Sequence, residues 1–475
     1  MATVLMVTPE ASPFAKIAGL ADVIAGLAPA LHSLGHEVAV LLPRYRCAFR
    51  DADRCFVPVL DVRLGVNEYR TAIYETRDRG VSWFFLDYPA LYDRPGINGD
   101  GGVDYPDNHI RYAVLSKAAL EFSRTTYRAS ILHCHDWQAG LVPVYLRQEA
   151  ERDHYLETLR SMFTIHNLGY QGLFPESALS EIGLDRTLFH LDGIEFYGSI
   201  SMLKGGILFS DMVTTVSRSY AREILTPEFG FGLDGVLRSR KDKLFGIVNG
   251  ADFTEWDPKS DPRIAANYSA GDVSGKRACR SDLLRAVDLP EAGSTTPVVG
   301  FTSRFAKQKG FDILVEALPD LLREPIRLVI LGTGDRGYED VLRSLAAKYP
   351  ERLALIVGFN DVLAHKIIAG ADMYLIPSRY EPCGLNQIYA MRYGSIPVVR
   401  AVGGLNDTVD ESVGFKFQEH SAGALLDSMR AAMGRFTADP EEWEAMKLRA
   451  MRKDYSWNSS AAEYSRLYQE LAVGT

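Results

Sequence analysis

The chain has 475 residues, of which 47% are hydrophobic and 24% are charged, a balance typical of globular proteins with more than one domain. Its formal net charge of -9 argues against nucleic acid, or an anionic membrane surface, as the main partner. No apolar run reaches the length of a membrane-spanning helix, and the five scattered cysteines suit reduced thiols. We therefore expect a cytoplasmic enzyme that has no membrane partner.

Short apolar, β-branched runs alternate with amphipathic stretches of helical length along the whole chain. Strands are predicted in the first half at TVLMVT, EVAVLLP, VSWFFLD, SILHCHD, RSMFTIHN and MVTTVS, and in the second half at PVVGFTS, IRLVILG, LALIVGF, MYLIPS and IPVVRA. This alternation predicts right-handed βαβ units, whose parallel sheets carry helices on both faces. The expected fold class is α/β, with two doubly wound, Rossmann-like domains facing a deep cleft.

A cluster of turn-forming residues in FGIVNGADFTEWDPKSDP separates the two halves. We expect an N-terminal domain over residues 1–248 and a C-terminal domain over residues 249–455. Apolar residues recur at helical spacing in the last segment, at Trp457, Ala461, Tyr464 and Leu467. Residues 456–475 are therefore predicted to form a helix that packs back on the first domain.

Two patterns suggest chemistry that their context does not support. LGTGDRG contains GxGxxG after an apolar run, but a dinucleotide site needs an acidic residue roughly 20 positions later, where Val357 and Gly358 stand. The DAD sequence at Asp51–Asp53 has no strand leading into it, so a solvated loop is favoured over a metal clamp.

The HCHD sequence at His133–Asp136 suggests zinc. On a strand, however, His133 and His135 face away from Cys134 and Asp136, so the four side chains cannot easily converge on one ion. We expect no metal and no cofactor in this chain.

Polar residues follow several predicted strands, where α/β sheets build ligand sites. In the first half, Asp136 follows one strand, and His166 and Asn167 follow another. In the second half, Arg304 and Lys309 share a strand–helix turn, and Glu381 follows a later strand. Each residue alone could serve a surface ion pair, a cap or a turn. Their joint placement favours a site.

The segment PFAKIAGLADVIAGLAPAL places Lys16 and Gly19 in the turn between the first strand and the first helix. Backbone N–H groups and a helix start in such a turn can bind an anion. A plain helix start with a solvated lysine is the alternative.

Nine segments of the chain, in order, resemble the bacterial glycogen synthases and plant starch synthases. They are SPFAKIAGLADV, YPDN, HCHDWQAGL, TIHNLGYQG, TPEFGFGLDG, VNGADFTEWDP, SRFAKQKG, GADMYLIPSRYEPCGLNQIYAMRYGSIPVVRAVGGLNDTV and DYSW. The resemblance implies a retaining glucosyltransferase of the GT-B architecture. It would transfer glucose from ADP-glucose, or alternatively UDP-glucose, to the nonreducing end of an α-1,4-glucan such as glycogen or a maltooligosaccharide.

The resemblance also implies roles for individual residues. The catalytic residues would be Lys16, Asp136, His166, Arg304, Lys309 and Glu381. The donor-binding residues would be Gly19, Asn249, Phe359, Cys383, Gly384, Leu385 and Asn386. The acceptor-binding residues would be Glu10, Asp22 and Asn167.

The chemistry of the reaction explains these residue types. Negative charge grows on the leaving diphosphate, and in the absence of a metal the cations of Arg304 and Lys309 would stabilise it. Glu381 would hold the donor sugar, and the main-chain carbonyl of His166 would stabilise positive charge at the anomeric carbon. Phe359 would stack on the adenine, although an aromatic residue so near a strand end could equally belong to the core.

The chain departs from the family pattern in several places. Ala18 replaces the first glycine of Lys-x-Gly-Gly-Leu, which would cost about 1 kcal/mol if that position needs a positive φ. On this ground Ala18→Gly is expected to raise activity or shift nucleotide preference. The other departures are Asn386 in place of threonine, Arg218 in place of proline and Tyr389 in place of a second glutamate.

Two rival functions stay open at this point. A glycosyltransferase of the same architecture could use another nucleotide sugar or a small acceptor. A weakly active glucan-binding homologue is the alternative from another class, suggested by Ala18 and Asn386.

Overall fold

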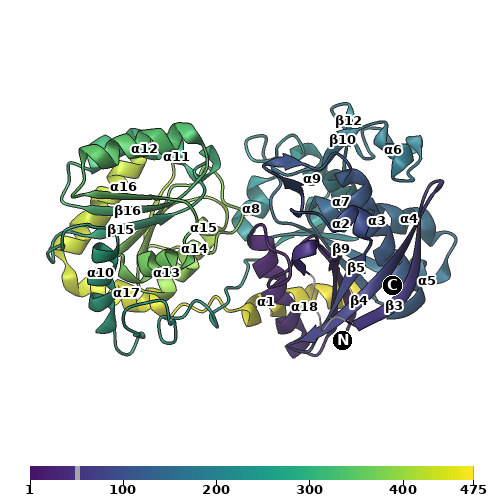
Figure 1. Ribbon diagram of the computed structural model, residues 1–475, viewed down its shortest axis with the longest axis horizontal. Helices are drawn as coiled ribbons and strands as arrows, with labels where there is room; N and C mark the ends of the chain where they lie inside the picture. Colours follow the sequence, from purple (N-terminus) through teal and green to yellow (C-terminus); the bar gives the residue numbers. More distant parts are fainter. Residues whose placement is uncertain (49–53, 474–475) are drawn as a thin grey trace. The chain divides into compact units, whose positions relative to one another are not determined.

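The computed structural model describes residues 1–48 and 54–473, and it divides into two compact units (Figure 1). Unit 1 comprises Met1–Gly250 together with the C-terminal segment that begins at Trp457. Unit 2 comprises Ala251–Ser456. The sequence Asp51–Asp53 lies outside the described residues.

Unit 1 is built on a sheet that has nine strands within the described residues. In sheet order they are β14 (Leu244–Gly246), β13 (Met212–Thr215), β9 (Arg160–Ile165), β8 (Ile131–His135), β1 (Thr3–Val7), β2 (Glu37–Pro43), β5 (Val81–Asp87), β4 (Asn67–Asp78) and β3 (Arg54–Leu64). Neighbouring strands from β14 to β5 are parallel, whereas β4 and β3 pair antiparallel. The six strands that the sequence predicts in this half correspond to β1, β2, β5, β8, β9 and β13.

The hairpin of β3 and β4 corrects the sequence interpretation. The sequence analysis predicts no strand between EVAVLLP and VSWFFLD, whereas β3 begins at Arg54 and β4 follows it. Both strands have long stretches of alternating burial, because one face packs on unit 1 and the other is more exposed. The strand β14 was also missed, since its three residues are too short to show a period.

Helices cover both faces of this sheet. Unit 1 contains α1 (Gly19–Ser33), α2 (Pro89–Tyr92), α3 (Asn108–Phe122), α4 (Leu141–Ala150), α5 (His154–Thr158), α6 (Ala178–Glu181), α7 (Met202–Phe209), α8 (Arg218–Glu223), α9 (Asp234–Ser239) and α18 (Trp457–Val473). Its short strands are β6 (Gly99–Asp100), β7 (Val103–Asp104), β10 (Leu173–Pro175), β11 (Glu195–Phe196) and β12 (Ser199–Ser201).

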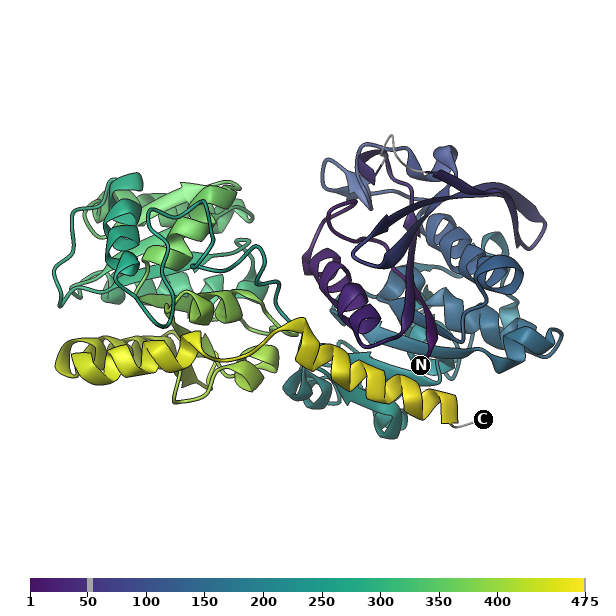
Figure 2. The same ribbon diagram turned by 90° about the horizontal axis from the view of Figure 1, so that it is seen from below.

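The C-terminal helix α18 packs against α1 in unit 1 (Figure 2). Trp457 lies directly on Gly26 of α1 and on Gly250, where a larger side chain would collide with the indole ring. Ser460 donates a hydrogen bond to the carbonyl of Val248 at 2.6 Å. The helix therefore completes the core of unit 1, although it follows unit 2 in the chain.

Unit 2 is built on a second sheet, which is parallel throughout the described residues. In sheet order its strands are β17 (Leu353–Val357), β16 (Arg327–Gly332), β15 (Val298–Thr302), β18 (Met373–Ile376), β19 (Ile396–Arg400) and β20 (Phe415–Phe417). The helices of unit 2 are α10 (Gly275–Ala286), α11 (Phe311–Leu321), α12 (Arg336–Lys348), α13 (Asp361–Gly370), α14 (Asn386–Arg392), α15 (Gly403–Thr408), α16 (Ala422–Ala438) and α17 (Pro440–Met451). Helices α11 and α12 cover one face of the sheet, and α10 and α13 cover the other (Figure 1).

This order is that of the doubly wound Rossmann fold, with one point where the direction of winding reverses. The reversal falls between β15 and β18 in unit 2 and between β1 and β8 in unit 1. Loops that leave the carboxyl ends of strands on either side of a reversal diverge, and ligands bind in the crevice between them. The expected α/β class is confirmed, with a parallel sheet in unit 2 and a sheet in unit 1 that is parallel except at the β5–β4–β3 edge. Among the described residues, no helix combines the length and apolar character needed to cross a membrane.

The packing of α18 yields a test of its contribution to stability. Leu467 is fully buried in the core of unit 1, so Leu467→Ala leaves a cavity and should lower the free energy of unfolding by about 2–5 kcal/mol. Gln469→Ala on the exposed side of the same helix is the matched control. Urea unfolding measures both variants, and equal stability of the two would show that α18 does not hold unit 1 together.

Candidate active site

The loop after β1 is organised by the buried carboxylate of Glu10. This carboxylate accepts hydrogen bonds from the N–H groups of Ile17 and Ala18, the latter at 3.1 Å. Two of the turn's donors thus already bind a carboxylate of the protein itself. Lys16 is exposed, and its ammonium pairs with Asp22 at 2.8 Å.

The conformation of Ala18 removes the strain that the sequence suggested. Its φ of -141° and ψ of -172° describe extended backbone, which alanine adopts without penalty. The expected cost, which depended on a positive φ, is therefore absent, and with it the conformational reason to expect a gain from Ala18→Gly. Gly19 begins α1, and a β-carbon there would meet no atom within 4 Å.

The loops after β8 and β9 are joined by Asp136. Its carboxylate accepts a hydrogen bond from the N–H of His166 at 2.7 Å. Burial, together with a smaller effect of the charge of Glu10, raises the pKa of Asp136 to about 7, although hydrogen bonds from the backbone N–H groups of His166 and Asn167 oppose the shift. The side chain of Asn167 accepts a hydrogen bond from the N–H of Gly169 at 3.0 Å. The main-chain position of His166 is thus set by a carboxylate in the loop after the neighbouring strand.

A chain of buried histidines lies behind His166. The Nε2 atom of His166 lies 3.0 Å from Nδ1 of His135, whose ring packs 4.1 Å from that of His133. His133 in turn bonds the hydroxyl of Tyr468, on α18, at 2.7 Å, and that of Thr164 at 2.6 Å. His133 and His135 share one strand face, as the sequence analysis expected.

Burial sets the charge state of these rings. It lowers the pKa values of His133 and His166 to about 3, and it lowers that of His135 well below the usual range. All three imidazoles are therefore neutral at physiological pH. His166 therefore offers its main-chain carbonyl and a neutral imidazole ring, and it lacks the imidazolium proton that a general acid would transfer.

In unit 2, the central feature is the ion pair of Lys309 with Glu381. The ammonium of Lys309 lies 2.9 Å and 2.6 Å from the two carboxylate oxygens of Glu381. Ser378 donates a third hydrogen bond to this carboxylate, at 2.9 Å. Lys309 follows β15 and Glu381 follows β18, so the contact spans the point where the sheet reverses.

Glycines allow the neighbouring turns to approach this ion pair. Gly310 has a φ of +78°, and a side chain there would collide with the carbonyl of Pro377. Gly403 and Gly404 lie against the Glu381–Cys383 turn, and the N–H of Gly404 donates to the carbonyl of Glu381 at 3.1 Å.

Four further residues that the sequence analysis assigns to donor binding follow Glu381 closely in the chain. Cys383 is buried, Gly384 has a φ of +72°, and Leu385 immediately precedes α14. Asn386 begins α14, and its amide donates to the carbonyl of Thr302, at the end of β15, at 3.2 Å. Asn386, which replaces the family's usual threonine, thus connects α14 to β15, the strand that precedes Lys309.

Arg304 and Phe359 are both exposed. In the described part of the chain, Arg304 has neither a hydrogen-bond nor an ion-pair partner, so its guanidinium is available to a ligand. Phe359 is 92% exposed, which makes the core interpretation of this ring wrong. Its neighbour Gly358 has a φ of +132°, which turns the chain outward after β17.

Asn249, one of the predicted donor-binding residues, is buried. The Oδ1 atom of Asn249 has no hydrogen-bond partner among the described residues.

The two remaining departures from the family pattern, Arg218 and Tyr389, both contact other side chains. Arg218 pairs with Glu463, on α18, at 2.9 Å, and Tyr389 stacks on Trp256 with ring centroids 4.6 Å apart. Arg218 therefore contributes to the docking of α18.

Sequence reasoning missed two residues that contact the predicted site. Ser378 stands inside the quoted segment IPSRYEP, where its position at a strand end was the available signal. His135 was weighed only as a zinc ligand, and nothing in the sequence pairs it with His166. The glycines of LGTGDRG have a packing role, since β-carbons on Gly332 and Gly334 would collide with the backbone of Ser303 and Phe305.

Two family models match the chain. The starch synthase catalytic domain matches residues 3–239, and the glycosyl transferases group 1 domain matches residues 290–446. The boundary between the two matches falls within the same part of the chain as the boundary between the two units.

Curated relatives match over nearly the full length. A glycogen synthase of Koribacter versatilis is 45% identical, over 97% of this chain and 96% of the relative. Glycogen synthase 2 of Geobacter sulfurreducens is 42% identical, over 99% of each chain.

Solved structures agree with the sequence matches. The catalytic domain of starch synthase IV from Arabidopsis thaliana, bound to ADP and acarbose, superposes with a TM-score of 0.89 at 32% identity, covering 99% of each chain. A sucrose-phosphate synthase from Thermosynechococcus elongatus shares the fold, with a TM-score of 0.61 at 17% identity. With parallel-sheet units, full-length relatives and a matching catalytic-domain model, the chain belongs to the glycogen synthase and starch synthase family of glucosyltransferases.

Proposed function

We propose that this chain transfers glucose from ADP-glucose to the nonreducing end of an α-1,4-glucan, with retention of the anomeric configuration. The observation that carries the proposal is the cluster of Lys309, Ser378 and Glu381 at the reversal point of the unit 2 sheet. The likeness to a starch synthase structure that contains ADP supports the choice of nucleotide. UDP-glucose is the second donor to be tested.

In this proposal, Lys309 and Arg304 stabilise the leaving diphosphate. An ammonium group has three N–H donors, and the two oxygens of Glu381 can accept two of them. The third remains for a phosphate oxygen. Glu381 thereby holds Lys309 in place while its carboxylate is itself held by Ser378. Arg304 is exposed in the same strand–helix turn and supplies the second cation.

The acceptor half consists of the loops after β1, β8 and β9 in unit 1. Asp136 fixes the main chain at His166, so the carbonyl of His166 can face positive charge at the anomeric carbon. Lys16 would contact the diphosphate or the acceptor, and Glu10, Asp22 and Asn167 would line the acceptor side. We propose domain bounds of 1–248 and 249–455, with the helix of 456–475 belonging to the first domain.

A donor panel tests the proposal. Radiolabelled ADP-, UDP- and GDP-glucose are each incubated with the full chain and a glycogen primer, and label in the glucan is measured. We expect the highest kcat/KM with ADP-glucose. Retention of glucan in a pull-down without label incorporation from any donor would instead identify a binding homologue.

Lys309→Met removes the ammonium and keeps most of the side-chain length. If Lys309 meets charge on the departing diphosphate, kcat/KM should fall by roughly 100- to 1,000-fold. Lys307→Met, in the same turn but exposed, is the matched control and should change little. Circular dichroism confirms folding, and near-normal turnover of the folded Lys309 variant would refute this role.

Glu10 provides a pH-dependent test of the acceptor half. Burial raises its pKa from 4.5 to about 7, so between these values the folded chain keeps a proton that the unfolded chain has released. Stability is therefore present below about pH 4.5 and falls as pH rises to about 7. Glu10→Gln keeps the acceptor for Ile17 and Ala18 without the charge, and at pH 8 it should be more stable than the parent by roughly 1–3 kcal/mol.

The gain in Glu10→Gln should disappear below about pH 4.5, where the parent carboxyl is neutral in both the folded and the unfolded chain. Glu151→Gln, an exposed position on unit 1, is the control and should show no such pH dependence. Urea unfolding across pH measures both variants. A pH-independent difference between parent and Glu10→Gln would contradict the assigned burial of this charge.

A further inference from the structure

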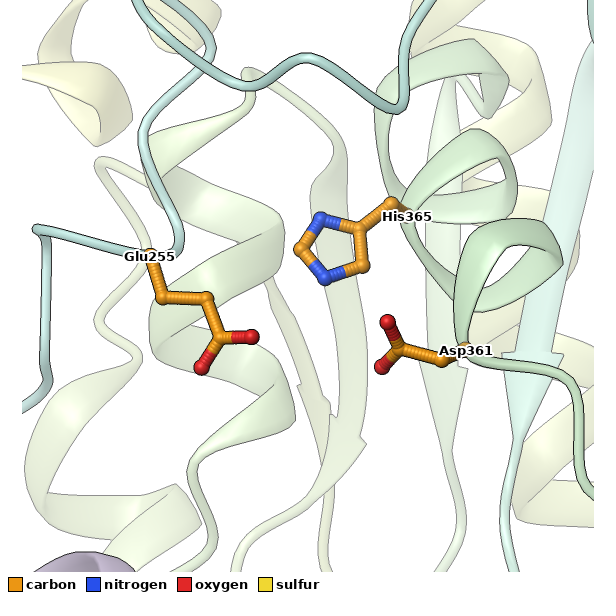
Figure 3. A group of neighbouring side chains, drawn as sticks. All are labelled: Glu255, Asp361 and His365. Carbon is orange, nitrogen blue, oxygen red and sulfur yellow. The ribbon is translucent and has the colours of Figure 1, made fainter. Parts of the chain in front are cut away.

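Three potential metal ligands gather in unit 2, away from the Lys309–Glu381 pair in sequence. Glu255, Asp361 and His365 each offer one ligand atom, and these atoms lie within 4.8 Å of one another (Figure 3). Glu255 lies in the loop before α10, and Asp361 and His365 lie on the first turns of α13. The proposed glucosyl transfer uses none of the three.

The imidazole of His365 is fixed on one side only. Its Nδ1 atom lies 2.7 Å from a carboxylate oxygen of Asp261, and both side chains are completely buried. Tyr393 donates to the same oxygen at 2.7 Å, and the ring of Trp256 stacks on His365 with centroids 3.6 Å apart. A carboxylate bound to Nδ1–H fixes the tautomer and leaves a lone pair on Nε2, which is the arrangement behind many metal-binding histidines.

The second nitrogen of this ring, Nε2, is left without a partner by the described residues. Among the described residues, nothing forms a hydrogen bond with Nε2 of His365, although the atom is buried. One ring nitrogen points into the space between the carboxylates of Glu255 and Asp361 (Figure 3). A lone pair that faces two carboxylates without a cation or proton between them is electrostatically unfavourable.

Arg263 balances the carboxylates but not the imidazole. Its Nε atom pairs with Asp361 and its Nη2 atom with Glu255, each at 3.0 Å. A guanidinium offers only donors and is permanently charged, so it can leave the carboxylates when another cation replaces it. The two carboxylates can therefore pair either with Arg263 or with a metal ion.

We propose that Glu255, Asp361 and Nε2 of His365 bind one divalent transition-metal ion of the Zn²⁺ class, which displaces Arg263 from the two carboxylates. One imidazole and two carboxylates suit Zn²⁺, Co²⁺ or Mn²⁺, whereas Mg²⁺ and Ca²⁺ prefer oxygen ligands alone. The ion would tie the loop that carries Glu255 to the first turns of α13, immediately after Phe359. The sequence analysis did not consider these three residues as metal ligands, because they come together only in the tertiary structure.

The experiment uses the full chain after treatment with a chelator. Zn²⁺ is titrated by calorimetry, and Co²⁺ is titrated with visible absorption as a report on the ligand field. We expect one equivalent of Zn²⁺ per chain with micromolar affinity or better, a Co²⁺ spectrum of an imidazole–carboxylate site, and a rise in the thermal midpoint on addition of Zn²⁺. Absence of stoichiometric Zn²⁺ binding would overturn the proposal.

Variants of exposed or half-exposed ligands keep the test independent of folding. Glu255→Gln and Asp361→Asn should each weaken Zn²⁺ binding at least about 10-fold, a loss typical of damaged metal sites. Glu411→Gln, at an exposed acidic position elsewhere on unit 2, is the matched control and should bind as the parent does. Equal Zn²⁺ affinity in all these variants would place the ion elsewhere and refute the site.

Arg263→Gln tests the exchange directly. If Arg263 competes with the ion, this variant should bind Zn²⁺ more tightly than the parent chain. If the cluster serves only to hold Arg263, Arg263→Gln should lose stability without any gain in Zn²⁺ affinity, and that result would overturn the proposal. The proposal does not rest on the glucosyl transfer, since each outcome is read from metal binding and thermal unfolding.

Discussion

The contact between Lys309 and Glu381 is the constraint on which the candidate donor site depends. A parallel sheet that reverses its winding between β15 and β18 brings two loops together at its carboxyl edge, and each loop contributes one partner. The two side chains are largely withdrawn from water, so their charges interact more strongly than those of a surface pair. Ser378 satisfies a further lone pair of the carboxylate. The result is a cation held in a defined position at the end of two strands.

In unit 1, burial changes the protonation of the candidate site residues. This site contains carboxyl groups whose pKa values rise toward neutrality and histidines that remain uncharged, because burial withdraws these side chains from water. The row of rings from His166 to His133 continues to Tyr468, on the last helix of the chain. The helix α18 thus supports the rings behind His166 as well as the core of unit 1.

Particular residues show how far sequence reasoning reached. The α/β class and the central strands followed from runs of buried β-branched residues, which is a local signal. The hairpin of β3 and β4 was missed because one of its faces is more exposed, so its strands lack the uninterrupted apolar runs of the central strands. Ala18 was assigned a strain that depends on its φ, and the structure gives it ordinary extended backbone. The open choice at Phe359 required its exposure, which no local pattern encodes.

The sequence by itself determined the two α/β halves, the family and the identity of the residues at strand ends, because periodicity and motifs are properties of neighbouring positions. Only the tertiary structure decided which of those residues touch. It paired Lys309 with Glu381, turned Glu10 onto the N–H groups beside Ala18, and gathered Glu255, Asp361 and His365 around one point. Such contacts join positions far apart in the chain, and they depend on sheet order and burial, which emerge only when the whole core is packed.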